Sequence, residues 1–227
     1  MKKIVVLSGA GISAESGINT FRGQDGLWEG HDIMEVASPV GWHKNPELVL
    51  DFYNQRRKQL KDVEPNFAHL AISKLESKYD VQVVTQNVDD LHERAKNSNI
   101  LHLHGELRKV RSTQFEDLIY DWEEDLNMGD LCEKGFQLRP HIVWFGEMVP
   151  MLPIAELRVS TADIVIIIGT SMLVYPAAGL IHHAPRHAEI YYVDPNPNVN
   201  YELGQRPFTL IEKKGSEGME ILLSKLI

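Results

Sequence analysis

The sequence predicts an α/β fold, built on a doubly wound and mainly parallel sheet, from two observations. Short runs of apolar and β-branched residues recur along the chain, and near-continuous apolar runs are typical of strands buried on both faces. Helical patterns lie between several of these runs, and such alternation indicates a parallel sheet with helices packed on it. Because 43% of the 227 residues are hydrophobic, the chain can form a sizeable core, and we expect a single domain over residues 1–227.

The expected strands and helices follow from these runs in chain order. The six expected strands are KKIVVLS from Lys2, VQVVT from Val81, NILHLH from Asn99, HIVWF from His141, ADIVIIIG from Ala162 and EIYYV from Glu189. In PNFAHLAISKLE, Pro65 suits the first turn of a helix. The apolar residues of this segment form one stripe at helical spacing, namely Phe67, Leu70, Ala71 and Leu75. The segment EGMEILLSKLI predicts a further helix.

Two regions interrupt this alternation. Residues 23–60 contain no expected strand but hold a helical pattern, PELVLDFYNQRRKQL, and residues 106–139 are acidic and irregular. We expect both regions to be insertions that together form a smaller module packed against the sheet domain.

Composition and charge argue against several classes of partner. The formal net charge is −9, and the short basic clusters at Arg56 and Lys213 do not make the stripe that nucleic-acid binding needs. No stretch approaches 18 apolar residues, and the apolar run near Lys2 is too short for a signal peptide, so we expect no membrane contact. One cysteine, Cys132, excludes an internal disulfide and fits a reducing cytoplasm. We expect a cytoplasmic monomer, because no long apolar helix is left uncovered.

The first polar motif, GAGISAESGINTFRG, follows the first expected strand. Gly9 and Gly11 permit a tight turn and the close approach of a pyrophosphate to backbone amides, as in Rossmann-like dinucleotide sites. Ala14 stands where the usual fingerprint has its third glycine, so the motif departs from that fingerprint. A plain strand-to-helix turn therefore remains an open alternative.

The second motif, TQNVDDLHERA, begins where another expected strand ends. Ligands bind beyond the carboxyl ends of parallel strands, and Gln86, Asn87 and Asp89 are expected at such an end. Amides and a carboxylate suit the hydroxyls and carboxamide of a nucleotide. The alternative is a helix cap, in which Asn87 or Asp89 caps the segment DDLHERA.

The third motif, LHLHGEL, places two histidines on one face of an expected strand. His104 is expected at the ligand edge of the sheet, where an imidazole can take a proton near neutral pH. Two alternatives remain open. His104 can be a buried, hydrogen-bonded histidine, or His102 and His104 can chelate a metal, although no third ligand follows at a recognisable spacing.

Two further turns follow strands near the end of the chain. GTSMLVYPAA contains Gly169, Thr170 and Ser171, and VDPNPN contains Asn196. Five polar or glycine-rich turns, all at strand ends, favour one continuous binding site over five unrelated turns.

Taken together, these motifs resemble the sirtuin family of NAD-dependent protein deacylases. The match covers GAGISAESGINTFRG, TQNVDDLHERA, LHLHG, RPHIVWFGE and GTSMLVYPAA, in the order of the family. The resemblance implies an NAD site made by Gly9, Ala10, Gly11, Ser13, Glu15, Thr20, Phe21, Arg22, Trp28, Gln86, Asn87, Asp89, Gly169, Thr170, Ser171, Asn196 and Gly215. It also implies that His104 is the general base and that Asn87 and Asp89 share in catalysis.

The resemblance further implies the substrate and the products. Acylated lysine side chains of proteins would bind as an added strand between two segments, with contacts from Val143, Phe145, Gly146, Glu147, Leu173, Val174 and Tyr175. The acyl group would pass to ADP-ribose, which gives nicotinamide and O-acyl-ADP-ribose. No nucleophilic side chain is needed, which agrees with the lack of a G-x-S-x-G motif.

One region departs from the family. Sirtuins usually bind a structural zinc with four cysteines, whereas residues 106–139 contain only Cys132 and no histidine. We therefore expect no zinc and no other metal. Apolar packing is expected to replace the metal, from Phe115, Leu118, Ile119, Trp122, Leu126, Leu131 and Phe136. Among these, Leu118, Ile119 and Trp122 have helical spacing.

The helix PELVLDFYNQRRKQL carries an arginine on its apolar stripe. The stripe consists of Val49, Phe52, Tyr53, Arg56 and Leu60, whereas Arg57 lies to the side. A phenol and a guanidinium three residues apart suit a carboxylate, although Arg56 can instead pair with Asp51 or Glu47. Class III sirtuins carry the same Tyr-x-x-Arg and a small residue that Ala37 matches. This resemblance implies removal of succinyl and malonyl groups, and of acetyl groups as well.

Three other functions stay open from the sequence. The same cofactor cleavage serves protein ADP-ribosyltransferases, and a non-catalytic module would bind NAD or ADP-ribose alone. A metal hydrolase would use His102 and His104 as ligands.

Overall fold

The main sheet of the computed structural model, which describes residues 1–19, 27–28 and 30–227, has six strands in the order β11-β10-β9-β1-β4-β5. The strands are β1 (Lys3–Ser8), β4 (Asp80–Thr85), β5 (Ile100–His102), β9 (Ile164–Ile168), β10 (Glu189–Val193) and β11 (Thr209–Ile211). Every pairing between them is parallel. The order runs in opposite directions from β1, so the loops after β1 and β9 meet at a topological switch point.

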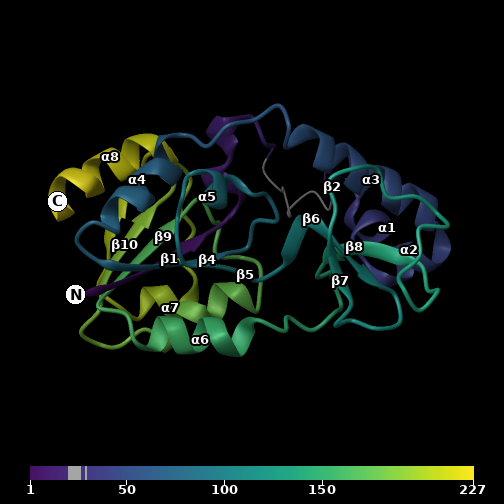
Figure 1. Ribbon diagram of the computed structural model, residues 1–227. Coiled ribbons are helices and arrows are strands. Elements are labelled where there is room, and N and C mark those ends of the chain that lie inside the picture. Colours follow the sequence, from purple (N-terminus) through teal and green to yellow (C-terminus); the bar gives the residue numbers. More distant parts are fainter. Residues whose placement is uncertain (20–26, 29) are drawn as a thin grey trace.

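Helices cover both faces of this sheet, which confirms the doubly wound α/β prediction (Figure 1). On one face lie α4 (Phe67–Leu75) and α8 (Gly215–Leu226), and on the other lie α6 (Leu152–Ser160), the 3-10 segment η3 (Ala177–His183) and α7 (Tyr201–Gly204). All five residues of β9 are buried, as expected for a strand covered on both sides.

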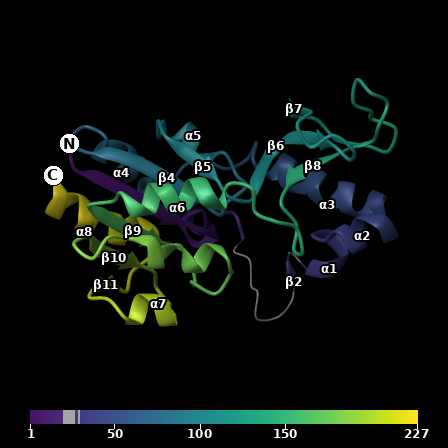
Figure 2. The same cartoon turned by 90° about the horizontal axis from the view of Figure 1, so that it is seen from below.

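A smaller module lies at the end of the molecule away from the two termini (Figures 1 and 2). It holds a three-stranded antiparallel sheet in the order β7-β6-β8, formed by β6 (Gly105–Ser112), β7 (Ile119–Asp121) and β8 (Leu138–Ile142). Its helices are α1 (Ile33–Val36), α2 (Pro39–Lys44) and α3 (Pro46–Gln59). Two short strands, β2 (Leu27–Trp28) and β3 (His31–Asp32), pair with each other.

Several predicted elements differ from the structure. Of the expected strand from His141, only His141 and Ile142 lie in a strand, and that strand is β8, which pairs with β6 and is no part of the main sheet. Residues 23–60 contain β2 and β3, although no strand was expected there. The helical spacing near Ile119 is misleading, because that residue lies in β7. An apolar pattern reports burial but not the partner strand, which accounts for these errors.

Two smaller differences concern element ends. Pro65 precedes the helix α4, whose N-cap is Asn66, and so does not occupy its first turn. The short edge strand β11 was not predicted, because its three residues carry little pattern. Between β4 and β5 lies the four-residue helix α5 (Leu91–Arg94), and after β1 lie the 3-10 turns η1 (Ala10–Ile12) and η2 (Ala14–Ser16). No helix among the described residues is both long and apolar enough to cross a membrane.

Apolar residues pack in the segment 106–139, but only part of the expected set is buried. Leu126 is fully buried with Leu50, Val110, Cys132 and Leu138. Ile119, Leu131 and Phe136 are instead exposed by 42%, 54% and 42%. The Cys132 thiol lies 3.4 Å from the Ser112 hydroxyl. Because residues 106–139 offer one thiol and no imidazole, they do not fit a tetrahedral zinc site.

Polar residues of α3 fasten this segment to the module. The Asn54 side chain donates to the carbonyl of Leu126 at 3.0 Å and accepts from its N–H at 2.9 Å. Arg57 is buried and donates to the carbonyls of Leu107 at 2.9 Å and Glu124 at 3.3 Å. Burial lowers the pKa of Arg57 to about 10, so it remains charged at neutral pH. These bonds hold α3 in place and leave the preceding residue, Arg56, to face elsewhere.

Candidate active site

A cavity of about 680 Å³ lies between the carboxyl ends of the main-sheet strands and the smaller module. We call its two sides the main-sheet wall and the small-module wall. The main-sheet wall comes from the loops after β1, β4, β9 and β10, and includes His104. The small-module wall comes from α1, α3 and the loop after β8, and includes Ala37, Tyr53, Arg56 and residues 142–147.

The glycines of the main-sheet wall let two loops touch at the switch point. The Gly11 N–H donates to the Gly169 carbonyl at 2.7 Å. A Cβ on Gly11 would lie 2.7 Å from the Cα of Gly169, and Gly169 itself has a φ of +60°. Both positions therefore require glycine. The turn GAGIS is thus partly explained by packing, and Gly9, Ala10 and Gly11 also line the cavity.

Ser13, Asn87 and Asp89 form a buried hydrogen-bonded network next to the cavity. The Ser13 hydroxyl donates to Asp89 Oδ2 at 2.9 Å and accepts from Asn87 Nδ2 at 3.1 Å. Gln86 Nε2 donates to the Thr170 hydroxyl at 3.2 Å, which links the loops after β4 and β9. The network fixes the two amides and the carboxylate at the carboxyl end of β4.

Asp89 also accepts a hydrogen bond from the first residue of α5, although the N-cap of that helix is Asp90 rather than the predicted Asn87 or Asp89. The Oδ1 of Asp89 accepts from the Leu91 N–H at 3.1 Å, and the residue lines the cavity. Burial raises the pKa of Asp89, although the bonds from Leu91 and Ser13 oppose this shift. The carboxylate is held by these two donors in an apolar setting.

His104 lines the cavity with one ring nitrogen bonded and the other available. Its Nδ1 donates to the Gln86 carbonyl at 3.1 Å, which leaves Nε2 as the unprotonated nitrogen of the neutral ring. Burial lowers the pKa of His104, against the opposing effect of the bond to Gln86. His104 lies outside β5, which ends at His102, and Gly105 with φ +83° starts β6 against the carbonyl of His141. A neutral imidazole in this position can accept a proton.

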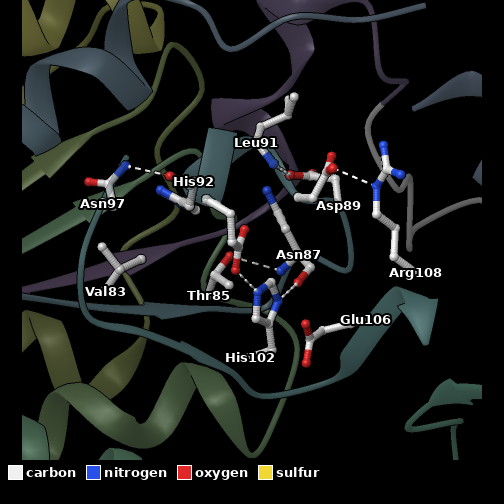
Figure 3. A network of polar contacts seen from close by, with 12 residues as sticks. Val83, Thr85, Asn87, Asp89, Leu91, His92, Asn97, His102, Glu106 and Arg108 are labelled. Atoms are coloured by element: carbon white, nitrogen blue, oxygen red, sulfur yellow. Dashed lines mark hydrogen bonds and ion pairs between the residues drawn. The ribbon is translucent and has the colours of Figure 1, made fainter. Parts of the chain in front are cut away.

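His102 does not share the site with His104. Its Nδ1 lies 2.9 Å from the Asn87 carbonyl (Figure 3). Its Nε2 lies 2.7 Å from Glu93 Oε1. His102, Glu93 and Glu106 offer atoms within 4.8 Å of one another, the spacing that a metal cluster would have. In this structure Glu93 binds His102, and Lys109 binds Glu106 at 2.8 Å, so all three groups have partners within the protein. The two histidines therefore do not act together as metal ligands.

The loop after β8 closes the small-module wall. The Phe145 N–H donates to the Ala37 carbonyl at 2.9 Å, and the Val143 N–H donates to the His104 carbonyl at 2.9 Å. The Glu147 carboxylate binds Arg139 at 2.6 Å and accepts from the Trp144 N–H at 2.8 Å. Burial acts to raise the pKa of Glu147, but the bond and charge of Arg139 outweigh it, so the pKa is lowered. Glu147 thus holds the loop in shape.

Tyr53 and Arg56 project from α3 into the small-module wall. Tyr53 is fully buried, and its oxygen accepts from the Trp144 indole N–H at 3.1 Å, which leaves the phenol hydrogen available. Burial raises the pKa of Tyr53 well above its ordinary value. Nε and Nη1 of Arg56 are buried without a hydrogen-bond partner among the described residues. The guanidinium lies 4.8 Å from the ring centre of Phe52.

An acidic partner for Arg56 within the protein was the alternative expectation. Among the described residues no ion pair joins Arg56 to Asp51 or Glu47, and Asp51 accepts from Gln55 instead. Arg56 thus lines the cavity, and two of its nitrogens have no internal anion among the described residues.

Most of the predicted site residues line this one cavity. These are Gly9, Ala10, Gly11, Glu15, Trp28, Ala37, Tyr53, Arg56, Gln86, Asn87, Asp89, His104, Val143, Phe145, Gly146, Glu147, Gly169, Thr170, Ser171, Val174, Tyr175, Asn196 and Gly215. Ser13 lies behind the wall, and Leu173 is exposed outside it. Thr20, Phe21 and Arg22 lie outside the described residues.

Several lining residues were not predicted. Trp144 lies in the expected strand HIVWF, but its bond to Tyr53 joins positions 91 residues apart and leaves no local signal. Asp194 and Lys214 line the far end of the cavity beside Asn196 and Gly215. The position of Asp194 directly after the strand EIYYV could have indicated it.

Comparisons with known proteins agree with this geometry. A model of the Sir2 family matches residues 9–176. An NAD-dependent protein deacylase of Helicobacter pylori strain 26695 is 60% identical over 227 residues, covering 100% of this chain and 98% of the relative. One from Bacteroides thetaiotaomicron is 50% identical over 233 residues, covering 100% and 99%.

Solved structures with the same fold contain ligands. A Sir2 homologue in complex with NAD has a TM-score of 0.88 and 40% identity, covering 99% of this chain and 89% of the other. A Sir2 protein bound to acetylated peptide has a TM-score of 0.82 and 26% identity, covering 99% and 92%.

Proposed function

Because this chain belongs to the Sir2 family, we propose that it is an NAD-dependent protein-lysine deacylase that prefers succinyl and malonyl groups and also removes acetyl groups. The observation that carries the preference is the pair of unpartnered guanidinium nitrogens of Arg56 on the cavity wall. Relatives named NAD-dependent protein deacylase, 50–60% identical over the whole chain, support the activity itself.

The main-sheet wall fits NAD in its residue types. Small residues of two loops, among them Gly9, Gly11 and Gly169, leave backbone exposed to the cavity and no side chain in the way. The amides of Gln86 and Asn87 and the carboxylate of Asp89 suit a carboxamide and ribose hydroxyls. Bound NAD supplies the bond between nicotinamide and ribose, whose cleavage drives the transfer of the acyl group to ADP-ribose.

His104 is the group that moves a proton in this scheme. Its Nδ1–H is held by the Gln86 carbonyl, so Nε2 is the atom that accepts a proton from a ribose hydroxyl. The lowered pKa keeps this nitrogen unprotonated at neutral pH. The buried network of Ser13, Asn87 and Asp89 holds the neighbouring groups without change of position, which limits reorganisation during the reaction.

The small-module wall distinguishes acyl groups. A buried guanidinium without an anion is unfavourable, and a carboxylate at the end of an acyl chain satisfies it. Tyr53 has a phenol hydrogen to donate, because its oxygen already accepts from Trp144. Ala37 is small and lines the same cavity as Arg56, so its side chain would take little of the space that a dicarboxylic acyl group needs. A charge-assisted bond of this kind is worth about 1.5–3 kcal/mol.

The acyl-lysine peptide is expected to lie along the loop after β8. Gly146, with a φ of +92°, and the exposed Phe145 and Tyr175 flank the cavity on two sides. An extended peptide between these segments would form main-chain hydrogen bonds, as in other strand-addition complexes. The Sir2 protein bound to acetylated peptide supports an acylated peptide as the substrate.

The test uses one peptide sequence with acetyl-, succinyl- or malonyl-lysine, incubated with NAD and followed by nicotinamide release and peptide mass. Arg56→Met is expected to lower kcat/KM for the succinyl peptide roughly 10- to 150-fold and to change that for the acetyl peptide little. Lys58→Met is the matched control, because Lys58 lies on the same helix but pairs with Asp125 outside the cavity. Equal losses on both peptides would contradict the preference, and ADP-ribosylated protein instead of deacylated peptide would indicate a transferase.

A further inference from the structure

Two histidines hold two consecutive carbonyls of the loop after β4. His104 binds the carbonyl of Gln86 at 3.1 Å, and His102 binds that of Asn87 at 2.9 Å. The second ring nitrogen of His102 lies 2.7 Å from a Glu93 oxygen. A carbonyl and a carboxylate can only accept hydrogen bonds, so His102 must donate from both nitrogens. This geometry requires the imidazolium form.

Among the residues that line the main cavity, Asn87 is the one to which His102 is hydrogen-bonded in the described part of the chain. His102 lines a second cavity of about 240 Å³, which shares Val88 and Asp89 with the main cavity but does not include Asn87. Figure 3 shows the imidazole of His102 against Asn87, with Glu106 beside it. The histidine side chain is only 9% exposed, whereas that of Glu93 is 42% exposed. His102 and Glu93 therefore lie outside the main cavity, and His102 contacts the main-sheet wall at Asn87.

We propose that Glu93 and protonated His102 form a clamp that positions Asn87 and Asp89 toward the nicotinamide end of bound NAD. The proposal rests on the proposed function for the identity of the ligand. His102 and Glu93 are positioning residues, because neither lines the main cavity. The clamp fixes the main chain of Asn87, whose side chain already binds Ser13 and whose N–H binds the Thr85 hydroxyl at 3.0 Å.

The hydrogen bonds of the Asn87 side chain explain how a displacement of the Asn87 carbonyl would move other groups in the active site. Asn87 Nδ2 donates to Ser13, and the Ser13 hydroxyl donates to Asp89. All three side chains are buried, so little solvent can replace a lost bond. A shift of the Asn87 peptide group therefore moves one amide and loosens one carboxylate on the main-sheet wall.

Glu93 is the carboxylate that bonds directly to His102. The charged and titratable groups around the second cavity and the ring are Asp89, Asp90, Glu93, Glu106, Arg108, Lys109, Asp121 and the buried His92. Lys109 pairs with Glu106 at 2.8 Å, and Arg108 pairs with Asp90 at 2.6 Å. These pairings leave Glu93 to hold His102, with the charge of Glu106 as a more distant contribution.

The sign of the pH dependence follows from the same contacts. Burial acts to lower the pKa of His102, but the bond and charge of Glu93, the Asn87 carbonyl and the charge of Glu106 outweigh it, so the pKa is raised. The imidazolium therefore persists through neutral pH and is lost as the pH rises through the raised pKa. A neutral ring turns a lone pair toward either Asn87 or Glu93, and one contact becomes repulsive.

The experiment compares Glu93→Ala with Glu93→Gln, and Glu106→Gln is the matched control. A glutamine amide can donate to Nε2 of neutral His102, so Glu93→Gln keeps the bond to Asn87 without a titrating proton. We expect Glu93→Ala to lower kcat/KM for NAD about tenfold at pH 7, and Glu93→Gln to stay within about threefold. The alkaline fall of the wild-type profile is expected to be absent in Glu93→Gln. Glu106→Gln removes a charge from the same cavity without touching His102, and should stay within about twofold.

Binding by calorimetry gives a readout that needs no turnover. Glu93→Ala is expected to weaken NAD binding about tenfold but leave ADP-ribose binding within about twofold, because the clamp acts at the nicotinamide end. Equal binding of NAD by wild type and Glu93→Ala would overturn the clamp, and so would equal losses in the Ala and Gln variants. Failure of the proposed function looks different: the wild type would release no nicotinamide with any acyl peptide, whatever the Glu93 variants bind.

Discussion

On the main-sheet wall, Ser13, Asn87 and Asp89 hydrogen-bond to one another, whereas on the small-module wall Arg56 has two buried nitrogens without a partner among the described residues. The polar side chains of this network on the main-sheet wall have hydrogen-bond partners within the protein. Arg56 on the small-module wall has no anionic partner among the described residues. The difference teaches that the chemistry depends on a preorganised network, while the choice of acyl group depends on one side chain.

The two walls also differ in how they are built. The loops of the main-sheet wall follow strands such as β9, every residue of which is buried. The small-module wall stands on α3, which is fastened by the polar bonds of Asn54 and Arg57 to a segment with a single cysteine. Changes in the first wall should therefore affect all substrates, and changes in the second should affect stability or particular substrates.

The largest effect is expected from His104→Ala, which removes the base from the main-sheet wall. General base catalysis is worth roughly 10²- to 10⁴-fold, so kcat should fall by that factor on acetyl, succinyl and malonyl peptides alike. Binding of NAD, measured by calorimetry, should fall far less than kcat, because His104 holds the Gln86 carbonyl but contributes no bond to the Ser13 network. A fall confined to one acyl group would place His104 among the specificity residues instead.

The next prediction tests whether apolar packing stabilises the smaller module. Leu126→Ala opens a cavity in a fully buried cluster and should lower the free energy of unfolding by about 2–5 kcal/mol. Leu131→Ala is the matched control, because Leu131 is 54% exposed and should change that free energy by less than about 0.5 kcal/mol. Denaturant unfolding measures both. Equal losses of unfolding free energy in the two variants would mean that the cluster around Leu126 does not stabilise the smaller module.

The main sheet could be predicted from the sequence because its central strands are apolar on both faces. Ile4, Val5, Val6 and Leu7 of β1 are all buried, and an unbroken run of this kind is typical of a strand with helices on both sides. The short strands of the smaller module carry no such signal. The run at His141 showed burial but not that its partner is β6, and the pattern near Ile119 fits a helix and a strand equally.

The residues of the candidate site likewise include some that the sequence could predict and others that it could not. Gln86, Asn87 and His104 could be predicted because each follows a strand, and position at a strand end is visible in the sequence. The contact between Ser13 and Asn87 joins residues 74 positions apart, so the sequence could not show that Ser13 lies behind the wall. Glu93 was missed because its link to His102 depends on where α5 packs.

Tyr53→Phe is expected to produce a smaller and more selective change on the small-module wall. The variant keeps the ring and loses the phenol hydrogen, so kcat/KM for the succinyl peptide should fall about tenfold while that for the acetyl peptide stays within about twofold. The Trp144 indole N–H loses its acceptor in both cases, which the acetyl peptide controls for. Parallel falls on both peptides would show that Tyr53 supports the loop rather than the acyl carboxylate.

The smallest expected effect is a displacement of the acid limb of the pH profile. His104 acts as a base when neutral, and burial lowers its pKa, so kcat/KM for the acetyl peptide should fall only as the pH drops below about 6.5, the ordinary value for histidine. His102, two residues away, is shifted in the opposite direction by Glu93 and so belongs to the alkaline limb. Because Glu93→Gln acts on His102 alone, it should leave the acid limb in place. An acid limb centred at or above the ordinary value would mean that the bond to the Gln86 carbonyl outweighs burial in setting the pKa of His104.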